Sequence, residues 1–348
     1  MSITLTPAAS AQQIIRRVAR RRRSTLLVVA ILVVIAAITS IGVGAVAISP
    51  GRVVNALLGH GTYGDHLIVT QFRLPRVLVG LCVGASLAVS GVILQAVTRN
   101  PLAEPSIVGI NGGAGLGAIL VLSFVHGALA SWLVPTAAFA GAALAGGSTY
   151  LLARRAGIVN PGRLALMGVA FGGLALALIQ LVIVYTVFTG DIQVALQWLT
   201  GSLWDRSWTN ILQVAPFTLL LLPLTLLLSD QLNLMGLGDD LPRSLGARLE
   251  LLKLTLLGVA VLLAGAAVAV AGTVSFVGLL APHMCRRLVG PGHRMLVPAS
   301  ACVGALLVTV ADTLGRALIP PGEIPVGLFT ALIGAPYFLF QIRKQLGK

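Results

Sequence analysis

Long apolar stretches separated by short polar segments run through almost the whole chain. A helix needs about 17–25 consecutive apolar residues to cross a bilayer. Eight windows of this kind cover residues 26–48, 74–97, 106–124, 132–152, 164–187, 211–228, 251–271 and 296–314, and two shorter candidates cover 274–288 and 326–342. The pattern predicts an all-α, polytopic membrane protein of about ten transmembrane helices.

Two of these windows need separate treatment. The first follows a basic segment, residues 1–24, and is longer than the roughly 7–15 apolar residues of a signal-peptide core, so we expect a retained span. The window at 274–288 is short and contains Pro282, so we expect a broken or kinked helix there.

Composition agrees with a membrane protein forming a single domain over residues 1–348. Hydrophobic residues make up 57% of the chain and charged residues 10%, and the mean hydropathy is +0.97. The 40 glycines suit close helix packing, and the pairs Gly80/Gly84 and Gly113/Gly117 have the spacing of small-residue helix interfaces.

A formal net charge of +14 would suit a nucleic-acid partner, but the basic residues lie in short loops between apolar windows. Their distribution instead indicates orientation in the membrane. With the N-terminus inside and ten crossings, only five of the 24 lysines and arginines fall outside, namely Arg52, Arg73, Arg76, Arg206 and Arg316. We therefore expect both termini to lie in the cytoplasm. We also expect the basic residues to reflect an environment of membrane lipid and not a nucleic-acid partner.

The sequence lacks the motifs of common catalytic sites. It contains no phosphate-binding G-x-x-x-x-G-K-[ST] loop, nucleophile elbow, H-E-x-x-H helix or CxxC pair. His283, Cys285 and His293 have no carboxylate neighbour, so we expect no metal site, no cofactor and no catalytic residues. Asp312 is the clearest intramembrane acid, and Arg316 lies one helical turn later, so the two are predicted to pair.

Arg73 and Arg76 mark the start of the 74–97 window. Three residues apart in a helix, they would share one face, and at a helix N-terminus they would oppose the helix dipole. We therefore expect an acidic partner from outside the helix. Interfacial anchoring is the alternative for both arginines. For Arg316, pairing with Asp312 at a helix C-terminus is the alternative.

The longest inside loop covers residues 230–250. Asp239 can cap a short helix, Pro242 fits its first turn, and Gly246 can end it in a left-handed conformation. Such a helix would offer a cytoplasmic contact for a partner, and an ordinary interfacial helix is the alternative.

An ordered set of motifs covers most of the chain from Arg73 onward. The set comprises Arg73-Leu-Pro-Arg76, Ser90-Gly91-x-x-x-Gln95, Asn100-Pro-Leu-Ala-Glu-Pro105, Trp198-Leu-Thr-Gly-Ser-Leu203, Gly236-Leu-Gly-Asp-Asp-Leu241, Gly272-Thr-Val-Ser-Phe-Val-Gly278, Ala311-Asp312, Glu323-Ile-Pro-Val-Gly327 and Gly334-Ala-Pro336. In these residues the chain resembles the FecCD-type permeases of ABC importers, which carry iron–siderophore complexes, haem or cobalamin.

The resemblance implies the type II ABC importer permease fold in a bacterial cytoplasmic (inner) membrane. It further implies a second permease copy or paralogue around one path, and ABC ATPase subunits that hydrolyse the ATP, so this chain itself would not be an enzyme. An extracytoplasmic substrate-binding protein would dock on Arg73, Arg76 and Arg316. The implied ATPase-coupling residues are Gly238, Asp239, Asp240, Leu241, Arg243, Ser244, Leu245, Gly246 and Arg248.

The function predicted on this basis is import of an iron–siderophore complex through a non-catalytic permease subunit. Import of cobalamin or haem by the same kind of permease is one alternative. A self-sufficient secondary transporter is an alternative of a different class, and the scarcity of intramembrane acids argues against proton coupling.

Overall fold

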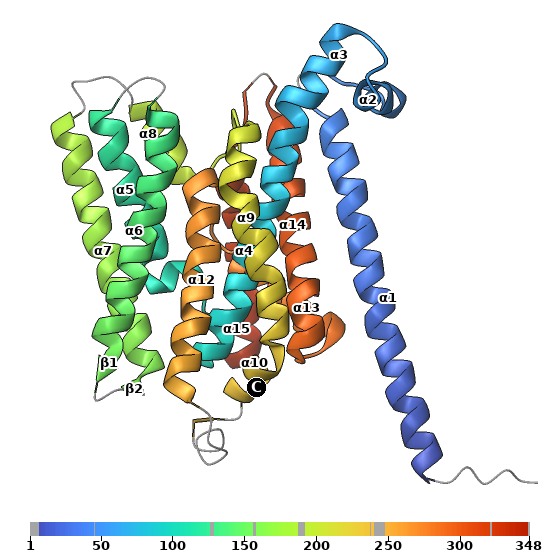
Figure 1. Ribbon diagram of the computed structural model, residues 1–348, viewed down its shortest axis with the longest axis vertical. Coiled ribbons are helices and arrows are strands. Elements are labelled where there is room, and N and C mark those ends of the chain that lie inside the picture. Colours follow the sequence, from blue (N-terminus) through green and yellow to red (C-terminus); the bar gives the residue numbers. More distant parts are fainter. Residues whose placement is uncertain are drawn as a thin grey trace, which may run out of the picture.

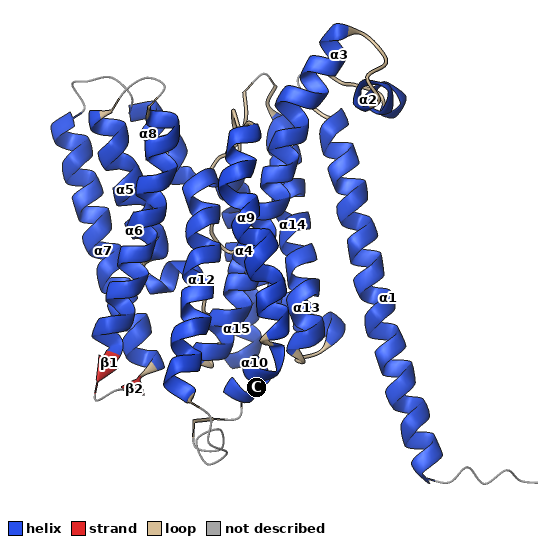
Figure 2. Ribbon diagram, in the orientation of Figure 1, coloured by secondary structure: helices blue, strands red, loops and turns tan. Residues whose placement is uncertain are grey.

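The computed structural model describes residues 7–44, 46–125, 129–155, 158–186, 192–236, 238–239, 248–320 and 322–346. Helices make up nearly all of this part (Figures 1 and 2). Strands β1 (Arg154–Arg155) and β2 (Ile158–Val159) form a small antiparallel pair between two helices. The prediction of an all-α membrane protein is confirmed.

Each predicted apolar window coincides with one helix. These helices are α1 (Pro7–Gly42), α4 (Leu74–Thr98), α5 (Ile110–Phe124), α6 (Ala130–Ala153), α7 (Pro161–Thr186), α9 (Trp208–Leu227), α12 (Leu249–Ala271), α13 (Val277–Val289), α14 (His293–Leu318) and α15 (Val326–Leu346). Within the described residues, 7 are long and apolar enough to span a membrane alone, whereas α5 and the apolar part of α15 (Val326–Phe340) are shorter and α13 has 13 residues. The other helices are α2 (Pro50–Leu57), α3 (Tyr63–Leu67), α8 (Ile192–Thr200) and α10 (Ser229–Met235).

Helix α4 forms the centre of the bundle and packs against α9, α12, α13 and α14. In its apolar window 83% of the residues are buried, compared with 11% in α1, which lies at the edge of the bundle (Figure 1). Glycine permits the close approach: Gly84 faces the backbone of Gly304 on α14, and Gly113 faces Gly141 on α6. Both predicted small-residue spacings therefore contain helix-packing positions.

Most of the weak window at 274–288 is helical, and only its first three residues are not. After α12 the chain is nonhelical through Gly272–Phe276, with positive φ at Gly272 and Phe276, and then forms α13. The prediction of a short, interrupted span is confirmed, but its location at Pro282 was wrong, because α13 continues through that residue. The nonhelical backbone is tolerated because it is buried within protein, where Phe276 N–H donates to Glu104 at 3.1 Å.

The helix that carries Arg73 and Arg76 starts earlier than predicted. It begins with α3, continues through a π-helical segment (Ile68–Arg73) and runs into α4 without a break. The π-helical segment precedes Pro75, which cannot donate a backbone hydrogen bond. The two arginines therefore lie well inside a helix, and the expected conflict with the dipole of a helix N-terminus is wrong.

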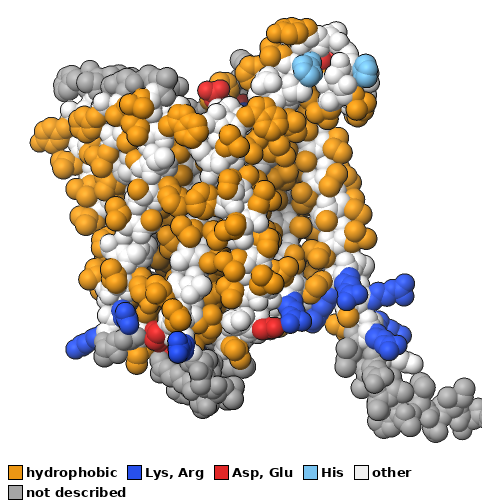
Figure 3. Space-filling model, viewed as in Figure 1, with side chains coloured by type: hydrophobic (Ala, Val, Ile, Leu, Met, Phe, Trp, Pro, Cys, Tyr) orange, Lys and Arg blue, Asp and Glu red, His pale blue; other side chains and the backbone are white. Residues whose placement is uncertain are grey.

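Charged side chains divide the molecule into two ends. Figure 3 shows lysines and arginines gathered at the end of the bundle that carries β1, β2 and the start of α1. The opposite end carries α2, α3 and the first turn of α9 (Figure 1). We refer to these as the inner and outer ends, following the orientation predicted from the sequence.

Candidate functional site

The outer end contains a buried ion cluster centred on Arg76. Its guanidinium donates to Asp312 at 2.7 and 3.1 Å and to Glu323 at 2.6 and 2.8 Å. The Arg76 side chain is 11% exposed and that of Asp312 is 4% exposed. Two carboxylates on one guanidinium, held in paired hydrogen bonds, satisfy nearly all of its donors. This cluster joins α4, α14 and the segment before α15.

The neighbouring arginines hold the C-terminal end of α1. Arg73 donates to the carbonyls of Ile41 at 2.7 Å and Gly42 at 2.9 Å, and also to Val46. Arg316 donates to Ser40 and to the Val43 carbonyl at 2.9 Å. Carbonyls at a helix C-terminus lack intrahelical partners and attract cations. The two arginines therefore cap α1, the least buried of the 7 long apolar helices found among the described residues.

The structure tests the predicted partners of these arginines within the chain. Arg316 Nε lies 3.2 Å from Asp312, so the predicted pair is confirmed. Arg73 and Arg76 do not share one set of partners, because Arg73 donates to the carbonyls that end α1 and Arg76 donates to two carboxylates. All three guanidinium groups are engaged within the chain. Their role in docking a binding protein stays a prediction.

Sequence reasoning missed Glu323 and the α1 carbonyls as partners. Glu323 stands 247 residues after Arg76, and no local spacing connects them. A carboxylate beside Pro325 in an apolar segment was nevertheless a signal, because a buried acid requires a cation.

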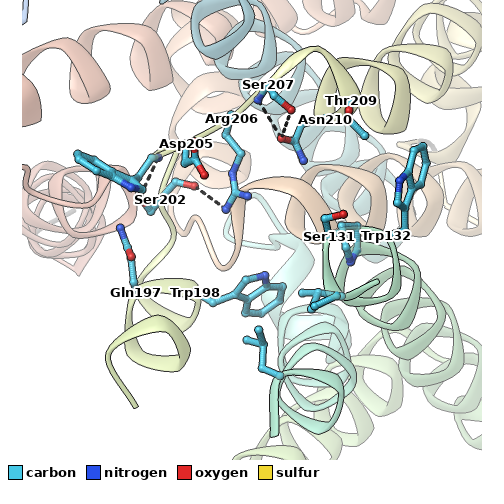
Figure 4. Close-up of a pocket in the computed structure, with 16 residues that line it drawn as sticks. Ser131, Trp132, Gln197, Trp198, Ser202, Asp205, Arg206, Ser207, Thr209 and Asn210 are labelled. Carbon is cyan, nitrogen blue, oxygen red and sulfur yellow. Dashed lines mark hydrogen bonds between the residues drawn. The ribbon is translucent and has the colours of Figure 1, made fainter. Parts of the chain in front are cut away.

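A second outer feature is a pocket of about 630 Å³ between the start of α6, the end of α8, the loop of residues 201–207 and the start of α9 (Figure 4). Trp132, Trp198 and Trp204 line it, and Trp198 is buried. The loop is folded back by left-handed conformations at Gly201 and Asp205.

The charged residues of this pocket's lining are Asp205 and Arg206, and its other polar residues include Gln197, Ser202 and Asn210. Arg206 extends toward Ser202 beside the Trp198 ring (Figure 4), and its one hydrogen bond, to the Ser202 carbonyl, is 3.5 Å long. Its Nε is buried and has no hydrogen-bond partner among the described residues. Burial lowers the pKa of Arg206 to about 10, so the side chain stays charged at neutral pH.

The inner end contains a third cluster, around Asp239. Lys253 donates to Asp239 at 2.9 Å, and Arg99 donates to Asp239 and, at 3.0 Å, to the Met235 carbonyl. Burial opposes ionisation of Asp239, but the two cations outweigh it and lower the pKa of this carboxyl. The cluster ties the loop after α10 to the ends of α4 and α12.

Of the predicted coupling residues, Gly238, Asp239 and Arg248 lie in the described part of the chain. Gly238 has φ 97° and Arg248 immediately precedes α12. The others, Asp240, Leu241, Arg243, Ser244, Leu245 and Gly246, lie outside the described residues. Sequence reasoning missed Lys253, a lone cation in an apolar helix whose side chain is only 2% exposed.

In the described part of the chain, a helix bundle with a central glycine-packed helix, an interrupted eighth span and polar clusters at both ends defines a polytopic membrane protein. The model of the FecCD transport family matches residues 31–344, so the chain belongs to that family.

Relatives match over nearly their full length. The chain is 46% identical over 313 residues to the Fe(3+)-citrate import system permease protein YfmE of Bacillus subtilis, covering 89% of this chain and 92% of that protein. It is 41% identical over 311 residues to the iron(3+)-hydroxamate import system permease protein FhuG of the same organism, covering 88% and 92%.

A solved structure has the same fold. An inward-facing metal-chelate type ABC transporter matches with a TM-score of 0.82 and 31% identity, covering 92% of this chain and 99% of that chain.

Proposed function

We propose that this chain is the permease subunit of an ATP-driven importer that carries an iron(III) chelate across the bacterial inner membrane. The observation that carries the proposal is 46% identity, over nearly the whole length, to a ferric citrate permease. Further relatives are permeases for ferric hydroxamates and for achromobactin, which supports an iron chelate as the cargo.

The proposal includes partners that supply energy and substrate. The sequence has no phosphate-binding loop, so separate ATPase subunits on the inner end would hydrolyse ATP. A second permease chain would complete the path, and an external binding protein would deliver the chelate to the outer end. Both termini would lie in the cytoplasm.

Reconstitution of the chain in liposomes with its ATPase and binding protein tests this function. We expect uptake of ⁵⁵Fe supplied as ferric citrate, and we expect it to stop when the ATPase, ATP or the binding protein is omitted. Uptake by the chain alone, driven by a proton or sodium gradient, would show a secondary transporter instead. Uptake of cobalamin or haem without iron chelate would assign the cargo to the alternative classes.

The proposed ATPase-coupling role rests on Asp239, which joins the loop after α10 to Arg99 and Lys253. Asp239→Asn removes the charge that holds both cations, so we expect a several-fold loss of substrate-stimulated ATP hydrolysis with membrane insertion retained. Asp230→Asn is the matched control, because Asp230 pairs with Arg294 on the exposed surface. Equal stimulation in the two variants would count against coupling through Asp239.

Arg73, Arg76 and Arg316 can dock a binding protein only if their guanidinium groups give up hydrogen bonds that they make within the chain. A carboxylate of the binding protein must replace an internal acceptor, and Glu323 is the most exposed carboxylate on Arg76. Glu323→Gln should therefore strengthen binding of the loaded binding protein if Arg76 docks it. Unchanged affinity at low and high salt would leave Arg76 a purely internal residue.

A further inference from the structure

The pocket at the outer end has the size and lining of a small-molecule site. Its volume of about 630 Å³ falls in the range of ordinary ligand pockets, roughly 300–1,000 Å³. Of the 4 tryptophans in the chain, only Trp208 lies outside its lining. Broad indole surfaces suit the apolar faces of a compact organic ligand.

Arg206 gives the pocket a preference for negative charge. It has one long hydrogen bond, and its Nε is enclosed without a partner among the described residues. An unsatisfied buried donor is destabilising, and a hydrogen bond to a ligand oxygen would remove that cost. Asp205 also lines the pocket, but it is exposed and no ion pair joins it to Arg206 among the described residues, so the Arg206 donors are not used by it.

The other outside arginines in the described part of the chain already have partners, and Arg52 pairs with Asp65. Arg76 and Arg316 already contact Asp312. Arg73 donates to the carbonyls that end α1. Among the outside arginines in the described residues, Arg206 therefore has the most unused hydrogen-bonding capacity.

We propose that this pocket is an outer subsite for an anionic, carboxylate-bearing iron(III) chelate. Arg206 donates to a carboxylate oxygen of the chelate, and Trp132, Trp198 and Trp204 cover its less polar faces. The proposal rests on the proposed function and sharpens it: the cargo is a negatively charged chelate, held at the outer end before it enters the path.

Direct binding to the assembled permease–ATPase complex in nanodiscs, without the binding protein, tests the subsite. The probe is ⁵⁵Fe-labelled ferric citrate, with a cationic ferric trihydroxamate as the comparison. We expect saturable binding of ferric citrate alone. Arg206→Gln should weaken it by about tenfold or more, and Arg206→Lys should restore part of it. Arg52→Gln, on an outside arginine away from the pocket, should leave it unchanged.

Three results would overturn the subsite: no saturable binding, equal binding of both chelates, or wild-type binding by Arg206→Gln. Loss of ferric citrate binding when phosphatidylglycerol is added to phosphatidylcholine discs would assign the pocket to a lipid phosphate instead. Failure of the subsite is distinct from failure of the proposed function, because ATP-dependent iron uptake by the wild-type complex is measured separately.

Discussion

Arg76 and Arg206 are both outer-end arginines, yet their surroundings differ in kind. Arg76 lies between two carboxylates and makes hydrogen bonds to both, at distances down to 2.6 Å. Arg206 has one bond, of 3.5 Å, and faces a pocket lined by tryptophans. A guanidinium whose donors are used within the fold stabilises the fold, whereas one with unused donors in a pocket is suited to bind a ligand.

The same distinction applies to the arginines that cap α1. Arg73 and Arg316 use most of their donors on backbone carbonyls, so their charge holds a helix in place. Position at the outer end therefore does not by itself identify a contact for an external partner. The acceptors already present around each guanidinium decide its role.

The largest expected effect is on the Arg76 cluster. Asp312→Asn removes the charge shared by Arg76 and Arg316 and leaves Glu323 as the one carboxylate in the cluster. Breaking a buried pair costs about 3–5 kcal/mol, so we expect strong loss of thermal stability and of folded yield. Asp230→Asn, in an exposed pair, should cost less than about 1 kcal/mol. Similar yields and melting points for the two variants would contradict the buried cluster.

A smaller effect is expected where Arg73 caps α1. Arg73→Leu removes hydrogen bonds from charged donors to three carbonyls, a loss on the order of 2 kcal/mol confined to this contact. Hydrogen exchange should increase in the last turns of α1, with little change in α4. Arg16→Gln, on the exposed part of the same helix, is the control. Unchanged exchange near Ile41 would show that α1 is held by apolar packing alone.

The smallest effect concerns Arg52 of α2 and Asp65 of α3, which form an ion pair in which the Arg52 side chain is 54% exposed and that of Asp65 is 8% exposed. The Arg52 guanidinium lowers the pKa of Asp65 below its ordinary value of 3.8. The stabilisation is therefore present at neutral pH and is lost only as the pH falls below 3.8 and through the lower folded-state pKa. Asp65→Asn should loosen the contact between α2 and α3 slightly in hydrogen exchange at neutral pH and leave iron uptake unchanged.

Hydropathy predicted the helices well, because membrane spans are set by length and apolar content. The span at 274–288 was recognised as weak for the right reason, its shortness, but the break lies at Gly272–Phe276 rather than at Pro282. A proline can remain within a helix when the surrounding protein packs around it, so its position alone did not locate the break.

The site was less predictable, because its partners are distant in sequence. Asp312 and Arg316 are one turn apart, and their pairing followed from spacing. Arg76 and Glu323 are separated by 247 positions. The acceptors of Arg73 are backbone carbonyls, which every residue carries, so the order of side chains in the sequence cannot identify them.

The most direct test of the distinction between these arginines is the thermal unfolding midpoint of Arg76→Gln and Arg206→Gln, measured side by side in the same detergent. Arg76→Gln should lower the midpoint by roughly 5 °C or more, since it strands two buried carboxylates. Arg206→Gln should leave it within about 1 °C of wild type, because that side chain contributes one long hydrogen bond. Equal losses in the two variants, or a larger loss for Arg206→Gln, would contradict the distinction between an arginine whose donors are satisfied within the fold and one whose donors are unused.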